Sequence, residues 1–270
     1  MTKIHSGVFD RVTFVVLALS VLVTFGCSDH QKRRWRYRSA EQNLQTALQA
    51  EHPDERRDAV ARIGESGYAD REDVFHVLDA VARTDPVIQI RCIAVRTFTQ
   101  YDDARPVGTL LTILQAKNPS DQALPPDDDL RWETVTALAA LARKGVMSEA
   151  QRELVCRILI KLLETDPSRN VRIVAAKALA EFKDRQVLLP LIRSLRNEDF
   201  GIADRAEQSL IALTGVTHSY DADAWEAWVA RVEDPFAHAG RVPQTTRPAG
   251  PTWWDKQARA WRRAIKLSND

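Results

Sequence analysis

The sequence predicts an all-α protein, and two observations lead to that prediction. Only 10 of the 270 residues are glycine, and the apolar residues, 44% of the chain, are mostly Ala, Leu, Val and Ile, which suit packed helices better than a turn-rich sheet. In addition, the segment TDPVIQIRCIAVRTF at 84–98 recurs as TDPSRNVRIVAAKAL at 165–179, with every matched position 81 residues apart. A long period of this kind indicates a repeat architecture.

Further copies of this segment lie between and around the two. Arg131 follows Arg91 by 40 residues and precedes Arg172 by 41, and HPDERRDAVARI places Arg56 in the same position. A fifth copy, FGIADRAEQSL, has Ala203 instead of the arginine. Each copy follows another amphipathic segment, so we expect five helical hairpins, at 40–65, 71–99, 105–143, 149–182 and 184–214.

The residue types of one copy explain why the segment recurs. Asp85 and Asp166 are suited to cap a helix by accepting backbone N–H bonds, and the proline after each is expected at the first helical position. Beyond it, apolar residues recur every four positions with a small residue at the centre: Ile90, Ala94, Phe98 and Val171, Ala175, Leu179. One hairpin cannot bury both faces of its helices, so the units are expected to stack into an α-solenoid over residues 40–214.

The pattern D-P-x-x-x-x-R-x-x-A over residues 40–214 resembles HEAT repeats, in particular the short bacterial type that is also found in phycobilisome lyases. In that family the Asp and the Arg belong to a ladder of contacts between adjacent units. The resemblance therefore implies structural roles for five residues of this chain: Asp85, Arg91, Arg131, Asp166 and Arg172.

The first 39 residues are expected to lie outside the repeat fold. VTFVVLALSVLVTFG, between Arg11 and Cys27, is uncharged; it is long for the core of a signal peptide and short for a membrane span of roughly 20 residues. Gly26-Cys27-Ser28 resembles a bacterial lipoprotein signal, in which the cysteine is lipidated and becomes the N-terminus. We therefore interpret residues 1–27 as a signal peptide or anchor and residues 28–39 as a basic spacer.

The side of the membrane on which the chain lies is left open by the charges. Residues 28–38 carry five bases, whereas two bases precede the apolar run, and positive charge tends to stay on the cytoplasmic side. The alternatives are a lipoprotein exported to the periplasmic face, an uncleaved single-pass anchor that faces outward, and an anchor that faces the cytoplasm. All three tether the chain to a membrane.

The remainder of the charge is divided unevenly along the chain. Residues 39–234 carry 24 bases and 33 acids, a net charge of −9, whereas both ends are basic. Recognition of duplex nucleic acid depends on neutralising phosphates, so an acidic middle argues against nucleic acid as the partner.

Catalytic and metal-binding motifs are not recognisable in the sequence. It has no CxxC, HExxH or GxSxG pattern and no two histidines at metal-ligand spacing, which predicts a non-catalytic protein without a cofactor or an evident small-molecule substrate. Cys92 and Cys156 are expected to be small buried residues. In the loop 117–129, Asp127, Asp128 and Asp129 could attract calcium, but the regular ligand spacing is absent, so a solvated loop whose aspartates cap a helix is expected.

The C-terminal region continues with three further segments. Residues 215–234 predict a helix that caps the array, 235–251 a Pro-rich linker, and 252–270 a basic amphipathic helix with an apolar side. Tryptophans on the capping helix and on the tail are possible contacts for a partner: Trp225, Trp228, Trp254 and Trp261.

Taken together, these features favour a non-catalytic, membrane-tethered scaffold whose partner is another protein of unknown identity. Two alternatives remain. The resemblance to lyase repeats implies an enzyme that attaches or detaches a bilin, although the shared residues build the fold. The basic ends would also suit a protein that assembles or organises the cell envelope.

Overall fold

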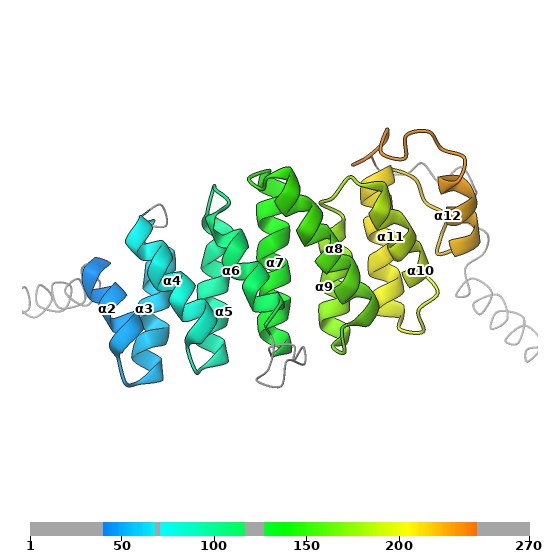
Figure 1. Ribbon diagram of the computed structural model, residues 1–270. Coiled ribbons are helices and arrows are strands. Elements are labelled where there is room, and N and C mark those ends of the chain that lie inside the picture. The colour runs from blue at the N-terminus through cyan, green and yellow to red at the C-terminus, as the bar shows by residue number, and fades with distance from the viewer. Residues whose placement is uncertain (1–39, 68–70, 117–126, 242–270) are drawn as a thin grey trace, which may run out of the picture. The chain divides into compact units, whose positions relative to one another are not determined.

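All regular structure that the computed structural model describes is helical. It describes residues 40–67, 71–116 and 127–241, and in these ranges it contains eleven α-helices and two short 3-10 helices, with no strand (Figure 1). The predicted all-α fold is confirmed. None of the helices within these ranges has the length and apolar character that crossing a membrane requires.

The helices fall into two compact units, one up to Thr97 and one from Phe98. In the first unit, α2 pairs with α3 and α4 pairs with α5, and the two hairpins pack through α2 against α4 and α3 against α5. The bounds of these helices are α2 (Ala40–Gln49), α3 (Pro53–Glu65), α4 (Glu72–Thr84) and α5 (Ile88–Thr97).

The second unit contains three hairpins and a terminal helix. Its elements are η1 (Phe98–Gln100), α6 (Arg105–Leu114), α7 (Asp128–Lys144), α8 (Glu149–Thr165), α9 (Arg169–Leu179), η2 (Arg185–Val187), α10 (Leu188–Ser194), α11 (Phe200–Thr214) and α12 (Ala222–Val229). The hairpins are α6–α7, α8–α9 and α10–α11, and α12 packs on α10. The helices thus pack pairwise, as the predicted repeats require.

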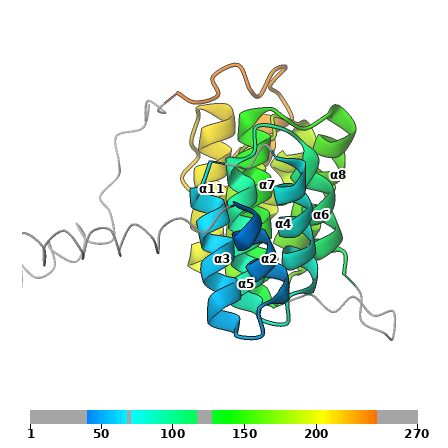
Figure 2. The same ribbon diagram turned by 90° about the vertical axis from the view of Figure 1, so that its left-hand side faces the viewer.

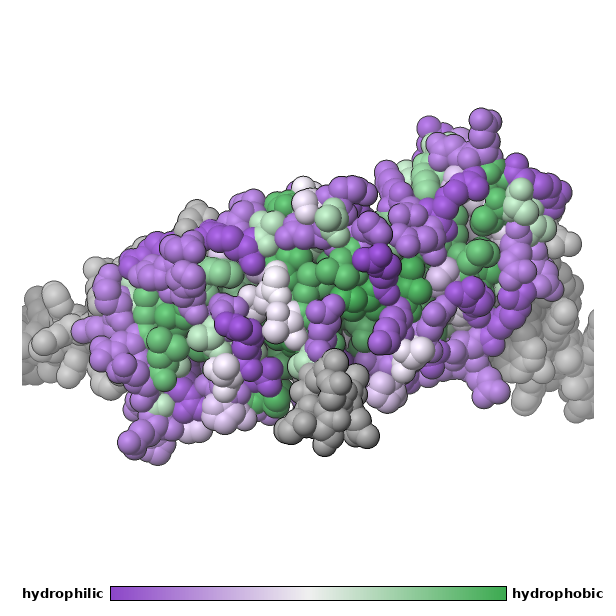
Figure 3. Space-filling model, viewed as in Figure 1, coloured by the Kyte–Doolittle hydropathy of each residue, from purple (hydrophilic) through white to green (hydrophobic). Residues whose placement is uncertain are grey.

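The second unit has two layers of helices. Helices α7, α9 and α11 pack side by side in one layer, and α8 packs against α10 in the other (Figure 2). The layer that holds α6 and α8 faces the viewer in Figure 3, where apolar surface is visible among the polar side chains. Three half-buried residues at four-residue spacing on α8 add to the apolar surface of that layer: Leu154, Ile158 and Leu162.

The apolar stripe predicted for each repeat forms the core. Ala94 and Ala175, the small residues at the centre of their stripes, have no exposed surface, and Ile90, Val171 and Leu179 are buried with them. A methyl group at these positions lets the backbones of neighbouring helices approach closely. The pattern that predicted hairpins is therefore also the pattern that packs them.

The Asp-Pro pairs lie in the turns, not at the first residues of the following helices. Asp85 follows the last residue of α4 and has an extended backbone (φ −60°, ψ 131°), and α5 begins only at Ile88. The residue before a proline is disfavoured in the helical region, so the helix ends there and the next one starts after the turn. The prediction that the proline occupies the first helical position was wrong.

Candidate protein-binding site

A buried ion pair joins the third and fourth hairpins. Arg131 on α7 donates from Nε and Nη2 to the two carboxylate oxygens of Asp166, both at 2.9 Å. The two side chains are 5% and 2% exposed. Asp166 also accepts the backbone N–H of Ser168 at 2.8 Å, so one carboxylate both shapes the turn and holds the neighbouring hairpin.

The first unit contains the equivalent pair. Arg56 donates from Nε and Nη2 to Asp85 at 2.8 and 3.2 Å, and this hydrogen bond raises the pKa of Arg56. Asp85 accepts the N–H of Val87 at 2.8 Å, as Asp166 does for Ser168. The arginine of each pair belongs to the hairpin that precedes the aspartate.

The other two arginines of the predicted ladder stay inside their own hairpins. The Nε of Arg91 donates to the carbonyl oxygen of Ala82 at 2.9 Å, and the Nε of Arg172 donates to that of Leu163 at 2.9 Å. These carbonyls belong to the last turns of α4 and α8, where the helix has no N–H to offer them. All the residues discussed for the ladder thus bind to groups that build the fold.

The exposed aromatic residues lie elsewhere, on the layer formed by α7, α9 and α11. Trp132 on α7 is 41% exposed, and Phe200 at the start of α11 is 68% exposed. Ile173 of α9, which the repeat aligns with Trp132, is half-buried. We call the exposed side of these three helices the α7–α9–α11 face, defined by Asp128, Asp129, Trp132, Thr136, Arg169, Ile173, Lys177, Phe200, Gly201, Asp204 and Gln208.

Contacts between α9 and α11 make this face continuous. A Cβ placed on Gly201 would lie 3.2 Å from Cδ1 of Ile173, so the isoleucine lies directly against the first turn of α11. The ring of Phe200 is 5.9 Å from that of Tyr220, which is 42% exposed. We call four residues of this region the aromatic row: Trp132 on α7, Ile173 on α9, Phe200 on α11, and Tyr220, which lies beside Phe200 in the turn after α11.

Tyr220 is held at the end of the aromatic row by Asp204. Its hydroxyl donates to the Asp204 carboxylate at 2.8 Å, and its backbone has a positive φ of 65°. Partial burial, followed by the hydrogen bond to Asp204, raises the pKa of Tyr220 to about 12. The phenol is therefore neutral at physiological pH, and its hydroxyl is bound to α11 through Asp204.

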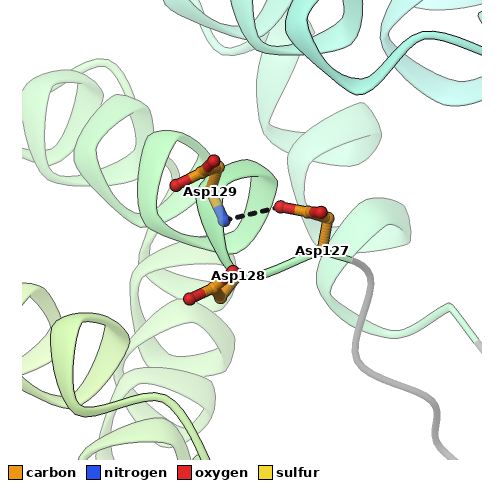
Figure 4. A group of neighbouring side chains, drawn as sticks. All are labelled: Asp127, Asp128 and Asp129. Carbon is orange, nitrogen blue, oxygen red and sulfur yellow. Dashed lines mark hydrogen bonds between the residues drawn. The ribbon is translucent and has the colours of Figure 1, made fainter.

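Three carboxylates flank the other end of the aromatic row (Figure 4). Asp127 caps α7 by accepting the backbone N–H of Asp129 at 3.0 Å, and Asp128 accepts from the hydroxyl of Ser168 at 3.1 Å. Carboxylate oxygens of the three aspartates lie within 4.8 Å of one another, and all three residues are exposed. Capping accounts for Asp127, and Asp128 and Asp129 lie on the same side of α7 as Trp132.

Two of the bases near this face are already paired. Arg169 forms an ion pair with Asp199, which lowers the pKa of that carboxylate, and Arg143 binds Glu181 at 2.6 Å. The carboxylates of Asp128 and Asp129 thus lie beside Trp132 in a setting that would favour a basic group on a partner.

The capping helix buries one of its two tryptophans. Trp225 has no exposed surface, and its Nε1 donates to Glu207 at 2.8 Å. Glu207 also accepts from the hydroxyl of Thr217 at 2.6 Å. Trp225 is therefore part of the core and is not available to a partner, which corrects its assignment, whereas Trp228 is half-buried.

His218 completes the buried cluster under α12. Its ring lies 4.8 Å from Trp225 and 6.1 Å from Trp228, and its Nε2 is buried without a hydrogen-bond partner. Burial lowers the pKa of His218 below its ordinary value of 6.5, although Glu207 and Asp221 act in the opposite direction. The neutral form of the imidazole is the one that fits here.

The two described cysteines were predicted to be buried residues without a reactive role. Cys156 is buried, and its burial raises the pKa of the thiol to about 12, so it is an unreactive side chain at neutral pH; Cys92 is buried as well. Residues 235–241 were expected to begin the linker, but Gly240 donates its N–H to the carbonyl of Ala212 at 3.0 Å and so joins the end of α11.

Other predicted functional residues lie outside the described part of the chain. These are Cys27, Trp254 and Trp261. The residues that the sequence did not single out are Trp132, Phe200 and Tyr220. For Trp132 a signal exists in hindsight, because the aligned positions hold Cys92 and Ile173, and a bulky indole rarely replaces such residues in a packed repeat.

Comparison with known proteins supports the repeat assignment. The family model for HEAT repeats matches residues 121–211, a stretch that extends from before α7 into α11 and includes most of the α7–α9–α11 face. A search of curated proteins found no match to this chain. Residues 121–211 therefore match HEAT repeats, and the described helices pack pairwise as such repeats do.

Proposed function

We propose that this chain is a non-catalytic scaffold that binds another protein on the α7–α9–α11 face and is tethered to a membrane by its N-terminal segment. HEAT repeats suggest a protein-interaction role in general. The observation that carries the proposal is the aromatic row, because exposed Trp and Tyr side chains are over-represented among residues that dominate the binding energy of interfaces.

The aromatic row offers binding surface at a small entropic cost. Tyr220 is held by its hydrogen bond to Asp204, so little of its side-chain freedom would be lost on binding. Large aromatic side chains that remain exposed on a folded protein leave apolar area in contact with water. A partner that covers the aromatic row would remove that area from solvent.

The role of the buried polar groups supports a scaffold over an enzyme. Among the described residues, three buried carboxylates bind groups of the fold: Asp85 binds Arg56, Asp166 binds Arg131, and Glu207 binds Trp225 and Thr217. A catalytic carboxylate or thiol needs a reactive protonation state and access to substrate. These groups are instead committed to contacts between helices.

The binding surface is tested by affinity capture from a membrane extract. Full-length chain is compared with Trp132→Ala and Phe200→Ala variants, and each is expected to retain about a tenth of the partner or less, since a dominant interface residue is worth about 1.4–2 kcal/mol or more. Leu189→Ala is the matched control, because Leu189 is 49% exposed on α10, outside the α7–α9–α11 face. Equal capture by all variants would contradict the proposed site.

The membrane tether is tested separately. Mass spectrometry of the mature protein is expected to show an N-terminal, lipid-modified Cys27, and Cys27→Ser is expected to abolish that modification. Detection of an intact Met1 and an unmodified Cys27 would exclude the lipoprotein form, and labelling from the two sides of the membrane would then identify which anchor is used.

A further inference from the structure

The chemistry of the α7–α9–α11 face specifies the kind of segment that fits it. The aromatic row offers three to four apolar contacts, and Asp128 and Asp129 precede Trp132 by four and three residues, so all three lie on one side of α7. Tyr220, in the turn after α11, and Asp204 on α11 repeat the combination of ring and carboxylate. A ligand with apolar side chains on one side and Lys or Arg beside them is therefore complementary to this face.

One segment with this chemistry belongs to the chain itself. Residues 252–270, TWWDKQARAWRRAIKLSND, carry five bases and two acids. In a helix, Trp254, Ala258, Trp261 and Ile265 would share one side, and bases would flank them. This segment lies outside the described residues, so its place is inferred from its sequence and from the surface that it would meet.

The length of the intervening chain permits contact. Gly240 is bound to Ala212, so the chain leaves the fold near the C-terminal end of α11. The 12 residues from 242 to 253 span up to about 40 Å when extended, at roughly 3.3 Å per residue. The 15 residues of α11 measure about 22 Å, and α7 is two helix spacings of about 10 Å away, so the far end of the aromatic row is about 30 Å distant.

The spacing of apolar residues in the segment also suits the face. Trp254 and Ile265 are 11 residues apart, which corresponds to about 16 Å along a helix. This length is close to the roughly 20 Å between α7 and α11, which carry the two ends of the aromatic row. One short helix laid across α7, α9 and α11 could therefore contact the row over most of its length.

From these observations we propose that residues 252–270 bind in cis to the α7–α9–α11 face and cover the aromatic row until a partner displaces them. The proposal rests on the proposed function, because it uses the same surface. It adds that residues 252–270 occupy this surface when no partner is bound. A short linker gives a tethered segment an effective concentration on the order of millimolar, so even a weak contact would be largely formed. A partner then has to compete with the chain's own C-terminus.

Carbodiimide crosslinking of the full-length chain tests this contact directly. The reagent joins a lysine amine to a carboxylate that touches it, so Lys256 or Lys266 is expected to become linked to Asp127, Asp128 or Asp129, as detected by mass spectrometry. The pair Lys144–Asp102, at 2.8 Å, is the positive control. Lys161 on α8 is exposed in the other layer and is not expected to link to the tail's Asp255 or Asp270.

An isotope mixture distinguishes binding in cis from binding between copies. Unlabelled and ¹⁵N-labelled chains are mixed before crosslinking, and the tail crosslinks are expected within chains of one label. Crosslinks that join the two labels at the statistical proportion would show that the segment binds a second copy and would overturn the proposal. Absence of tail crosslinks while Lys144–Asp102 forms would overturn it as well.

Charge-reversal variants provide the matched comparison. Arg259→Glu combined with Arg263→Glu is expected to lower the yield of the tail crosslink at least fivefold, whereas Arg247→Glu, in the linker, is expected to leave it within twofold. Trp132→Ala should lower the yield and Leu189→Ala should not. Equal effects of tail and linker reversals would contradict specific docking.

The same variants separate this inference from the proposed function. If residues 252–270 cover the aromatic row, the tail charge reversal is expected to increase capture of the partner several-fold, while Trp132→Ala decreases it. If capture depends on Trp132 but no tail crosslink forms, the face binds a partner and the cis contact is refuted. If the crosslink forms but capture does not depend on Trp132, the proposed function fails and the cis contact stands.

Discussion

At the scale of single residues, the buried ion pair of Arg131 and Asp166 determines how the third hairpin is joined to the fourth. Both side chains are nearly fully buried, and each carboxylate oxygen accepts one guanidinium N–H at 2.9 Å. Each of these charges alone would be costly to bury, and the partner's opposite charge offsets that desolvation cost.

We expect Arg131→Met to lower the free energy of unfolding by about 3–5 kcal/mol, because Asp166 would be left buried without its counter-charge. The double variant Arg131→Met with Asp166→Asn should recover part of that loss, since the asparagine side chain can still accept the N–H of Ser168. Urea denaturation followed by circular dichroism measures both. Arg157→Ala, which removes an exposed pair on α8, should cost about 0.5 kcal/mol or less.

His218 makes the C-terminal cap sensitive to acid. Its pKa is lowered in the folded chain, so the unfolded chain takes up the proton first, and stability that is present above pH 6.5 is lost as the pH falls towards the lowered pKa. The unfolding midpoint is expected to fall more steeply from pH 7 to pH 5 in the native chain than in His218→Gln. If the unfolding midpoints of the two proteins changed equally with pH, protonation of His218 would not be what destabilises the cap.

At the scale of elements, helix ends depend on backbone geometry that sequence only partly reveals. Gly145 and Gly215 end α7 and α11 with nearly equal positive φ angles, 71° and 70°. A Cβ on Gly145 would meet nothing within 4 Å, whereas a Cβ on Gly215 would overlap the carbonyl of His238. Substitution of Gly145 would therefore cause conformational strain alone, whereas substitution of Gly215 would cause the same strain and a steric overlap.

Gly145→Ala is expected to cost about 1 kcal/mol, the usual penalty for a side chain in the left-handed region. Gly215→Ala should cost at least twice as much, because the segment 235–241 must also move away from α11. Thermal unfolding of the two variants measures the difference. If the two variants lost equal stability, displacing residues 235–241 from α11 would cost no free energy.

The sequence was most informative about hairpins and least informative about surfaces. Apolar residues at every fourth position predicted the stripe of Ile90 and Ala94 because packing needs that period whatever the neighbours are. The start of the helix after Asp85 was predicted too early, because an aspartate can accept backbone N–H bonds in the turn before a helix as well as at the first residue of the helix. Trp225 was named as a possible partner contact and Trp132 was not, since the exposure of an indole depends on which helix lies above it, and a periodic pattern does not specify this.

At the scale of the molecule, the array needs a terminal cap that hides the last apolar layer. Trp225 and His218 supply it in the second unit, where their rings pack together. One oxygen of the Glu207 carboxylate on α11 accepts from the Trp225 indole and the other accepts from the Thr217 hydroxyl. Terminal repeats without such a cover expose the core that an adjacent repeat would bury.

A chain that ends at Thr214 is expected to bind the dye ANS and to aggregate at micromolar concentration, because removal of α12 uncovers the apolar surface of α10 and α11. A chain that ends at Arg241 retains α12 and Gly240 and should remain monodisperse. Size-exclusion chromatography with light scattering distinguishes the two. A soluble, monomeric product from the shorter chain would show that α12 is dispensable for solubility.

The position of the Asp–Arg pairs has a consequence for how such a protein could grow. Two of the described hairpins present a guanidinium to the hairpin that follows, whose turn supplies the carboxylate: Arg56 meets Asp85, and Arg131 meets Asp166. A gene segment that encodes two successive hairpins therefore carries both halves of one such connector. Its tandem duplication would copy that connector intact, without compensating changes in the older copies.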